Sequence, residues 1–74
     1  MKRIQTEKSV HQIITMAKEN KIDLYFSFDD GNYVYFYLNN NMYIKKGIRG
    51  SLFHKKVRNA GGKLESGLKN YYTF

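Results

Sequence analysis

Residues 22–46 read IDLYFSFDDGNYVYFYLNNNMYIKK, and this stretch decides the fold. Its apolar residues recur at every second position, which is typical of strands with one buried face. The pattern predicts strands over residues 22–28, 33–38 and 42–46, separated by Asp-Asp-Gly and Asn-Asn-Asn. Short polar segments of this kind are typical of tight turns. We therefore expect a three-stranded antiparallel meander.

The first turn decides how the first two strands pair. A three-residue loop at 29–31, with Gly31 in the left-handed conformation, places Phe26 opposite Val34. A two-residue turn would instead place Phe26 opposite Tyr35 and would mix aliphatic residues with tyrosines on one face. We expect the three-residue loop because it keeps the two kinds of side chain apart.

The second turn is expected to be a three-residue loop at 39–41, which places Phe36 opposite Ile44. One face of the sheet is then consistently apolar and consists of Ile22, Leu24, Phe26, Phe28, Val34, Phe36, Leu38, Met42 and Ile44. The opposite face carries Tyr25, Ser27, Tyr33, Tyr35, Tyr37, Tyr43 and Lys45.

A helix is predicted before the meander, over residues 6–20. Its apolar residues follow the helical repeat and are Val10, Ile13, Ile14 and Ala17. Thr6 is one candidate N-cap, and Ser9 with Gln12 forms a second candidate, a capping box.

A second helix is predicted after the meander, over residues 51–60. Ser51 is its candidate cap, and Gly61-Gly62 are expected to end it. Its inward stripe consists of Phe53, Val57 and Ala60, and its outward face of His54, Lys55 and Arg58.

These elements predict a single α+β domain over residues 1–74, in which both helices pack on the apolar face of a three-stranded antiparallel sheet. The aromatic tail, residues 68–74, is interpreted either as a short fourth strand or as a flap over the tyrosines.

The charge of the chain is concentrated in its second half. The net charge is +7, yet residues 1–41 contain as many acidic as basic residues, and residues 42–74 hold the whole excess. Such asymmetry is typical of a surface that binds a polyanion, although it also fits a solvated, solubilising face. The candidate nucleic-acid-binding residues are Lys45, Lys46, Arg49, His54, Lys55, Lys56 and Arg58.

Tyrosine provides the second candidate surface. The predicted aromatic face carries Tyr25, Tyr33, Tyr35, Tyr37 and Tyr43. Tyrosine rings can stack on unpaired bases, but they are equally suited to a protein interface or to a homodimer.

The sequence shows little that points to catalysis, a metal or a cofactor. His11 and His54 lie on separate predicted helices, and Asp29 and Asp30 are explained by the turn in which they lie. The chain has no cysteine, which excludes disulfides and thiolate metal sites and favours a reducing cytoplasm. No secretory signal or membrane span is predicted. We therefore expect a cytoplasmic protein that is not an enzyme, uses no cofactor and does not bind membranes.

The expected order of helix, three strands and helix resembles the double-stranded-RNA-binding domain. In that family lysines at the start of the second helix grip phosphates, and Lys55, Lys56 and Arg58 stand at about that place. Residues 45–61 also look like the end of the small HicA toxins, a bacterial ribonuclease family with the same fold. Their catalytic histidine lies on the strand after the first turn, and residues 31–36 contain none. The resemblance implies the fold and nucleic-acid binding but not nuclease activity.

Two functions are therefore expected from the sequence. The first is a small non-enzymatic module that binds RNA or DNA through the basic second helix and the tyrosines. The alternative is a protein-interaction module, either an inhibitor or a homodimeric regulator, that binds an acidic protein or a second copy through the tyrosine-rich face. The abundance of Lys, Asn, Ile, Tyr and Phe, whose codons are AT-rich, suggests a low-GC bacterium or one of its phages.

Overall fold

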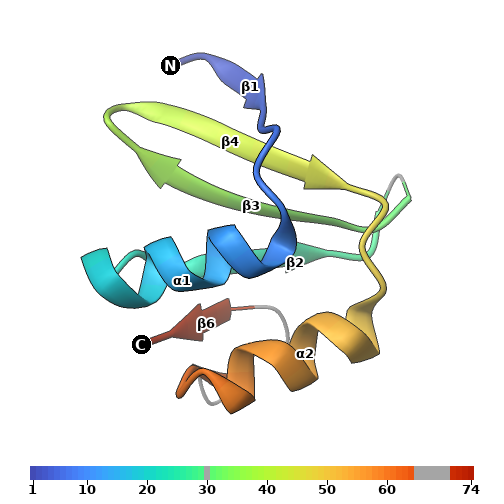
Figure 1. The fold of residues 1–74 in the computed structure, drawn as a ribbon. Helices are drawn as coiled ribbons and strands as arrows, with labels where there is room; N and C mark the ends of the chain where they lie inside the picture. The colour runs from blue at the N-terminus through green and yellow to red at the C-terminus, as the bar shows by residue number, and fades with distance from the viewer. Residues whose placement is uncertain (30, 65–70) are drawn as a thin grey trace.

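The computed structural model describes residues 1–29, 31–64 and 71–74. Within these ranges the chain forms two helices and one six-stranded mixed sheet with the strand order β1-β4-β3-β2-β6-β5 (Figure 1). The elements in chain order are β1 (Arg3–Gln5), α1 (Val10–Asn20), β2 (Leu24–Ser27), β3 (Tyr33–Leu38), β4 (Asn41–Lys46), α2 (Gly50–Asn59), β5 (Lys63–Leu64) and β6 (Tyr71–Thr73). The predicted α+β class is confirmed, with more strands than the sequence indicated.

The β2–β3 hairpin has the expected register. Phe26 lies opposite Val34, and Gly31 has a φ of 85°, in the left-handed region. The strand β2 is shorter than predicted, however, and Phe28 lies beyond its end with 68% of its surface exposed. The prediction that Phe28 belongs to the buried face is therefore wrong.

The β3–β4 hairpin differs from the prediction by one residue. Leu38 pairs with Asn41, so the turn consists of Asn39 and Asn40 alone. Both have positive φ, 51° and 65°, as a two-residue type I′ turn requires, and asparagine tolerates this conformation. Because side chains alternate along a strand, this one-residue shift exchanges the two faces of β4.

Because of this exchange, four side chains of β4 lie on the face opposite to the one that the sequence predicted. Met42 and Ile44 pair with residues of the tyrosine-bearing face, whereas Tyr43 pairs with Phe36 on the face toward the helices. By the same alternation Lys45 lies toward the helices. The predictions for Met42, Ile44, Tyr43 and Lys45 are therefore wrong.

The helix α1 begins after the second of its two candidate caps. The Gln12 backbone N–H donates to Ser9 Oγ at 3.2 Å, and the Ser9 backbone N–H donates to Gln12 Oε1 at 2.8 Å, which completes a capping box. Thr6 does not cap the helix; its backbone N–H donates to the Ile44 carbonyl at 3.0 Å in the segment that leads from β1.

The helix α2 begins one residue earlier than predicted. Arg49 occupies the N-cap position without a side-chain hydrogen bond, and Ser51 lies inside the helix, so the prediction of Ser51 as the cap is wrong. The end is as expected: Gly61 has a φ of 98°, and the Gly62 backbone N–H donates to the Val57 carbonyl at 2.9 Å.

Both helices pack on one face of the sheet, and α1 lies in front of β2 in Figure 1. The core joins side chains of α1, α2 and the strands in one cluster, which contains Ile13, Ile14, Ala17, Leu24, Phe26, Val34, Phe36, Ile48, Phe53, Val57 and Tyr72. No helix formed by the described residues lies on the other face of the central strands.

The outer strands complete the sheet on both sides of the meander. The strand β1 pairs in parallel with β4, and β6 pairs with β2, so that Leu24 lies opposite Tyr72. Of the two interpretations of the tail, residues 71–73 form the additional strand; residues 68–70 lie outside the described residues. In the part of the chain that the structure describes, neither helix is long and apolar enough to cross a membrane.

Candidate functional site

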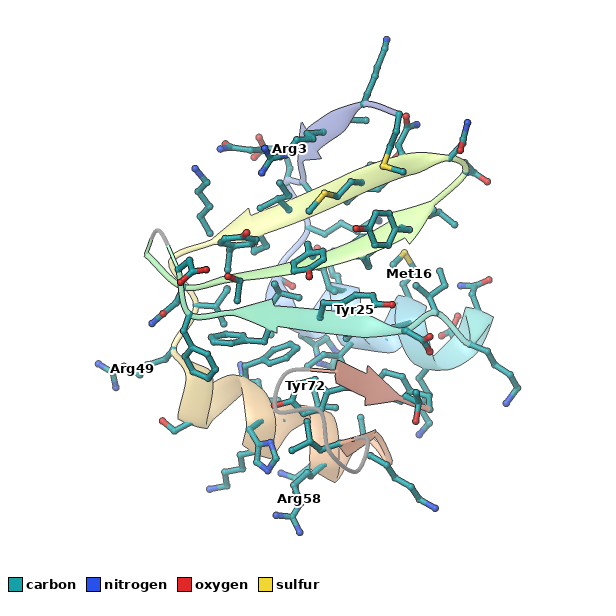
Figure 2. All side chains as sticks on the ribbon, turned by 180° about the vertical axis from the view of Figure 1, so that it is seen from behind. Arg3, Met16, Tyr25, Arg49, Arg58 and Tyr72 are labelled. Atoms are coloured by element: carbon teal, nitrogen blue, oxygen red, sulfur yellow. The ribbon has the colours of Figure 1, made fainter. Side chains whose placement is uncertain are left out.

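Four tyrosines lie together on the sheet face that the helices do not cover. We define the tyrosine face by these side chains of β2 and β3, namely Tyr25, Tyr33, Tyr35 and Tyr37. They share one side because they alternate with the core residues of the same strands, and Tyr25 lies opposite Tyr35 across the ladder. Figure 2 views the sheet from this side and labels Tyr25.

The four rings form one packed cluster around Tyr35. Tyr25 and Tyr35 are stacked, with ring centroids 5.0 Å apart and planes 13° from parallel. The ring of Tyr37 stands nearly perpendicular to both, at 5.9 Å from Tyr25 and 6.1 Å from Tyr35. Tyr33 lies 5.6 Å from Tyr35 on the other side. Aromatic pairs at these distances and angles attract one another, so each ring holds its neighbours in place.

The cluster is partly open to solvent. Tyr37 is the most accessible member, with 45% of its surface exposed, and the other three are half-buried. Burial raises the pKa of Tyr35 above its ordinary value, and the neighbouring phenols of Tyr37, Tyr33 and Tyr25 raise it further. The Tyr35 hydroxyl therefore keeps its proton at neutral pH and can donate a hydrogen bond.

Apolar side chains of β4 extend the tyrosine face. Ile44 lies opposite Tyr35, and Met42 lies opposite Tyr37. Ile44 is only 5% exposed, and its ladder partners are Tyr35 on one side and Gln5 on the other. The surface beside the tyrosines is thus closely packed.

Cations border the face where β1 meets β4. In the register of the sheet, Arg3 lies opposite Met42 and Gln5 lies opposite Ile44. Arg3, Gln5, Ile44 and Lys46 together line a groove. Lys46 itself pairs with Tyr33 across β3 and β4. The structure therefore places two cations on the tyrosine side of the sheet, Lys46 next to Tyr33 and Arg3 beyond Met42. Arg3 was not among the predicted binding residues.

Tyr43, the fifth predicted aromatic residue, does not belong to the tyrosine face. Its ring stacks on Phe36 with centroids 5.3 Å apart and planes 11° from parallel, and it packs against the core. The two lysines at the end of β4 also separate, since Lys45 pairs with Val34 on the helix side and Lys46 with Tyr33 on the tyrosine side.

The basic side chains of α2 point in several directions rather than forming one patch. Arg49 and Lys56 border a groove against the start of α1, whereas His54 and Arg58 border a hollow next to β5. Lys55 is exposed. Figure 2 shows Arg58 at the opposite end of the molecule from Arg3. The predicted cationic residues of α2 and its N-cap therefore do not join Lys46 and the tyrosine face in one surface.

One predicted binding residue, His54, has a structural partner. Its Nδ1 lies 3.0 Å from the hydroxyl oxygen of Tyr72, within hydrogen-bond distance. The Tyr72 ring is 5% exposed and meets Phe53 edge-on at 5.4 Å. Burial raises the pKa of Tyr72, so its hydroxyl stays protonated at neutral pH. His54 thus links α2 to β6 instead of standing outward as predicted.

No metal site is found among the described residues. Within residues 1–29, 31–64 and 71–74, no three histidine or carboxylate side chains lie close enough together to hold a metal ion. His11 and Asn59 line a groove between the helices without an acidic partner among its lining residues.

Comparison with known proteins gives no relative from which a function could be inferred. A scan against protein-family models finds no matching family, and searches of the curated proteins and of the solved structures find no match. The tyrosine face, with Arg3 and Lys46 on the same side of the sheet, is the feature that points to a function.

Proposed function

We propose that this protein is a small non-catalytic module that binds nucleic acid through the tyrosine face. The observation that carries the proposal is the packed cluster of four tyrosines on a sheet face without a covering helix, bordered by Arg3 and Lys46. Aromatic rings provide stacking partners for bases, and cations neutralise phosphates.

The packing of the rings favours binding. Because Tyr35 touches Tyr25, Tyr33 and Tyr37, the side chains have little freedom left to lose when a ligand arrives. A preorganised surface avoids part of the entropic cost of association. Stacking on such rings contributes about 1–3 kcal/mol for each base.

The charge of the whole molecule supports the same ligand. A net charge of +7 attracts a polyanion over distances of about a Debye length, whichever side the cations occupy. The exposed Lys55, Lys56 and Arg58 on α2 add to this attraction without being placed beside the tyrosines. Binding is then expected to weaken as salt concentration rises, because bound counterions are released from the nucleic acid.

Replacing Tyr37 tests the proposal most directly, since it is the most exposed ring of the cluster. The Tyr37→Ala variant is expected to bind labelled oligonucleotides about 5- to 150-fold more weakly, the equivalent of one lost stacking contact. Fluorescence anisotropy at several salt concentrations measures the affinity.

The control for this test is Leu52→Ala. Leu52 is similarly exposed, at 49%, but it lies on α2 and belongs to no strand of the tyrosine face, so its loss should leave the affinity unchanged. The proposal fails if the wild-type protein binds neither RNA nor DNA at low salt.

A protein interface through the same face is the second candidate. The observation in its favour is that Tyr25 and Tyr35 stack on each other and that Met42 and Ile44 flank them, which gives a packed apolar surface. Tyrosine and methionine are enriched at protein interfaces. Light scattering distinguishes a dimer from a monomer. This function would be favoured if the wild-type protein is a dimer without affinity for nucleic acid and if the Tyr37→Ala variant is a monomer.

A further inference from the structure

The tyrosine face also indicates which form of nucleic acid it fits. Resting on the proposed function, we infer that this face binds an unpaired strand in preference to a duplex, with bases on the rings of β2 and β3 and the sugar–phosphate backbone along β4 and β1. The orientation of the rings, the cations on the same side of the sheet and the shape of the two possible ligands favour the unpaired strand.

The rings present planes in two directions. Tyr25 and Tyr35 are nearly parallel, whereas the plane of Tyr37 lies 78° from the first and 89° from the second. A base lying parallel to one of these planes therefore meets the other ring side-on. We call this arrangement the tyrosine corner; Tyr37 is its exposed side, where a flat group can reach a ring.

A duplex cannot offer such a group without being opened. Each base in a double helix is covered above and below by its neighbours, so that only its edges are accessible in the grooves. Stacking a base on a protein ring requires an unpaired or flipped-out base, and opening a duplex costs a few kcal/mol. The tyrosine corner therefore discriminates in favour of a strand whose bases are already free.

The cations are placed for the backbone of that strand. Lys46 lies one strand away from Tyr33, and Arg3 lies two strands away from Tyr37. The positions of β4 that carry Lys46 and face Arg3 are four residues apart, about 13 Å along the strand. Two cations separated in this way can contact two phosphates of one strand that are not adjacent, and Gln5 lies in the groove between the cations.

The test compares one sequence in two forms. A labelled oligothymidine and its duplex with oligoadenine are titrated with wild-type protein at the same salt concentration, and fluorescence anisotropy gives both affinities. We expect the single strand to bind at least about tenfold more tightly, and ring stacking to quench the intrinsic fluorescence of the tyrosines.

Matched variants locate the ligand on the molecule. Tyr37→Phe keeps the ring and is expected to retain the preference for the single strand, whereas Tyr37→Ala is expected to abolish it. Arg3→Gln and Lys55→Gln each remove one exposed positive charge, the first beside the tyrosines and the second on α2. Arg3→Gln should weaken single-strand binding several-fold more than Lys55→Gln does.

The outcomes separate this inference from the proposed function. If the protein binds the duplex as tightly as the single strand, or if Lys55→Gln lowers single-strand affinity more than Arg3→Gln, the inference is overturned while nucleic-acid binding stands. If neither form binds at low salt, both are overturned. Circular dichroism of each variant verifies that it is folded, and the comparison of Arg3→Gln with Lys55→Gln provides the readout if Tyr37→Ala is not.

Discussion

The two faces of the central strands are built from alternate residues of the same segments, yet they differ in what covers them. Toward the helices, Val34 and Phe36 are each only 1% exposed. On the other face their neighbours Tyr35 and Tyr37 keep part of their surface in solvent. Tyrosine is well suited to a partly buried position, because its ring can pack against neighbours while its hydroxyl contacts water. One face thus forms the core, and the other keeps a partly exposed tyrosine cluster.

The largest expected difference between the faces is in stability. Phe36→Ala should lower the free energy of unfolding by about 3–5 kcal/mol, because it empties a fully buried site. Tyr37→Ala, at the next position on the opposite face, should cost only about 1 kcal/mol, mainly through lost ring contacts. Urea denaturation measures both.

A milder substitution keeps this comparison measurable. If Phe36→Ala does not fold, Phe36→Leu should still destabilise the protein more than Tyr37→Leu does. Equal losses at the two positions would contradict the assignment of one face to the core and the other to solvent.

A smaller effect is expected at the turn that assigns the side chains of β4 to the two faces. Asn40 has a φ of 65°, and a residue with a β-carbon pays about 1–2 kcal/mol in this region unless, like asparagine, its side chain compensates. Asn40→Ala should therefore destabilise the protein by up to that amount, whereas Asn40→Gly should be neutral or stabilising. Thermal unfolding measures the difference. The opposite order would indicate that the turn is not of the two-residue type.

The smallest effect is a loss of stability at alkaline pH. Burial raises the pKa of Tyr35 above the ordinary value of 10.0, so the folded state holds this proton more tightly than the unfolded chain does. The stability that this difference contributes is fully present below pH 10.0 and is lost as the pH rises through the folded-state pKa. Tyr35→Phe should make the free energy of unfolding less sensitive to pH in this range. Urea denaturation at several pH values measures this dependence. An unchanged pH dependence would show that Tyr35 ionises as freely in the folded protein as in the unfolded chain.

Much of this architecture could be predicted because it depends on local patterns. Alternation predicted the strand β3, and the helical repeat predicted α1, although the predicted start at residue 6 lies before the observed start at Val10, which follows the capping box of Ser9 and Gln12. The register of the first hairpin could be predicted because the three-residue loop keeps apolar residues and tyrosines on separate faces. Each of these signals lies within a few residues of the element that it predicts.

What could not be predicted depended on pairing between distant segments or on a single turn residue. The strand β1 has only three residues, and its partner β4 lies far along the chain, so no local pattern marks it. Arg3 was missed for this reason. Tyr43 was misplaced because three successive asparagines allow either of two loop lengths, and one residue of difference exchanges the faces. The link between His54 and Tyr72 likewise joins helix and strand in space alone.

The position of Tyr72 has a consequence for the order in which the protein folds. This ring fills the core from β6, and its strand pairs with β2, which lies far away in the sequence. Contacts between such distant segments cost loop-closure entropy and slow folding. Until β6 pairs with β2, that strand has only β3 beside it and the core lacks an aromatic ring. The addition of β6 is therefore expected to be a late step in folding.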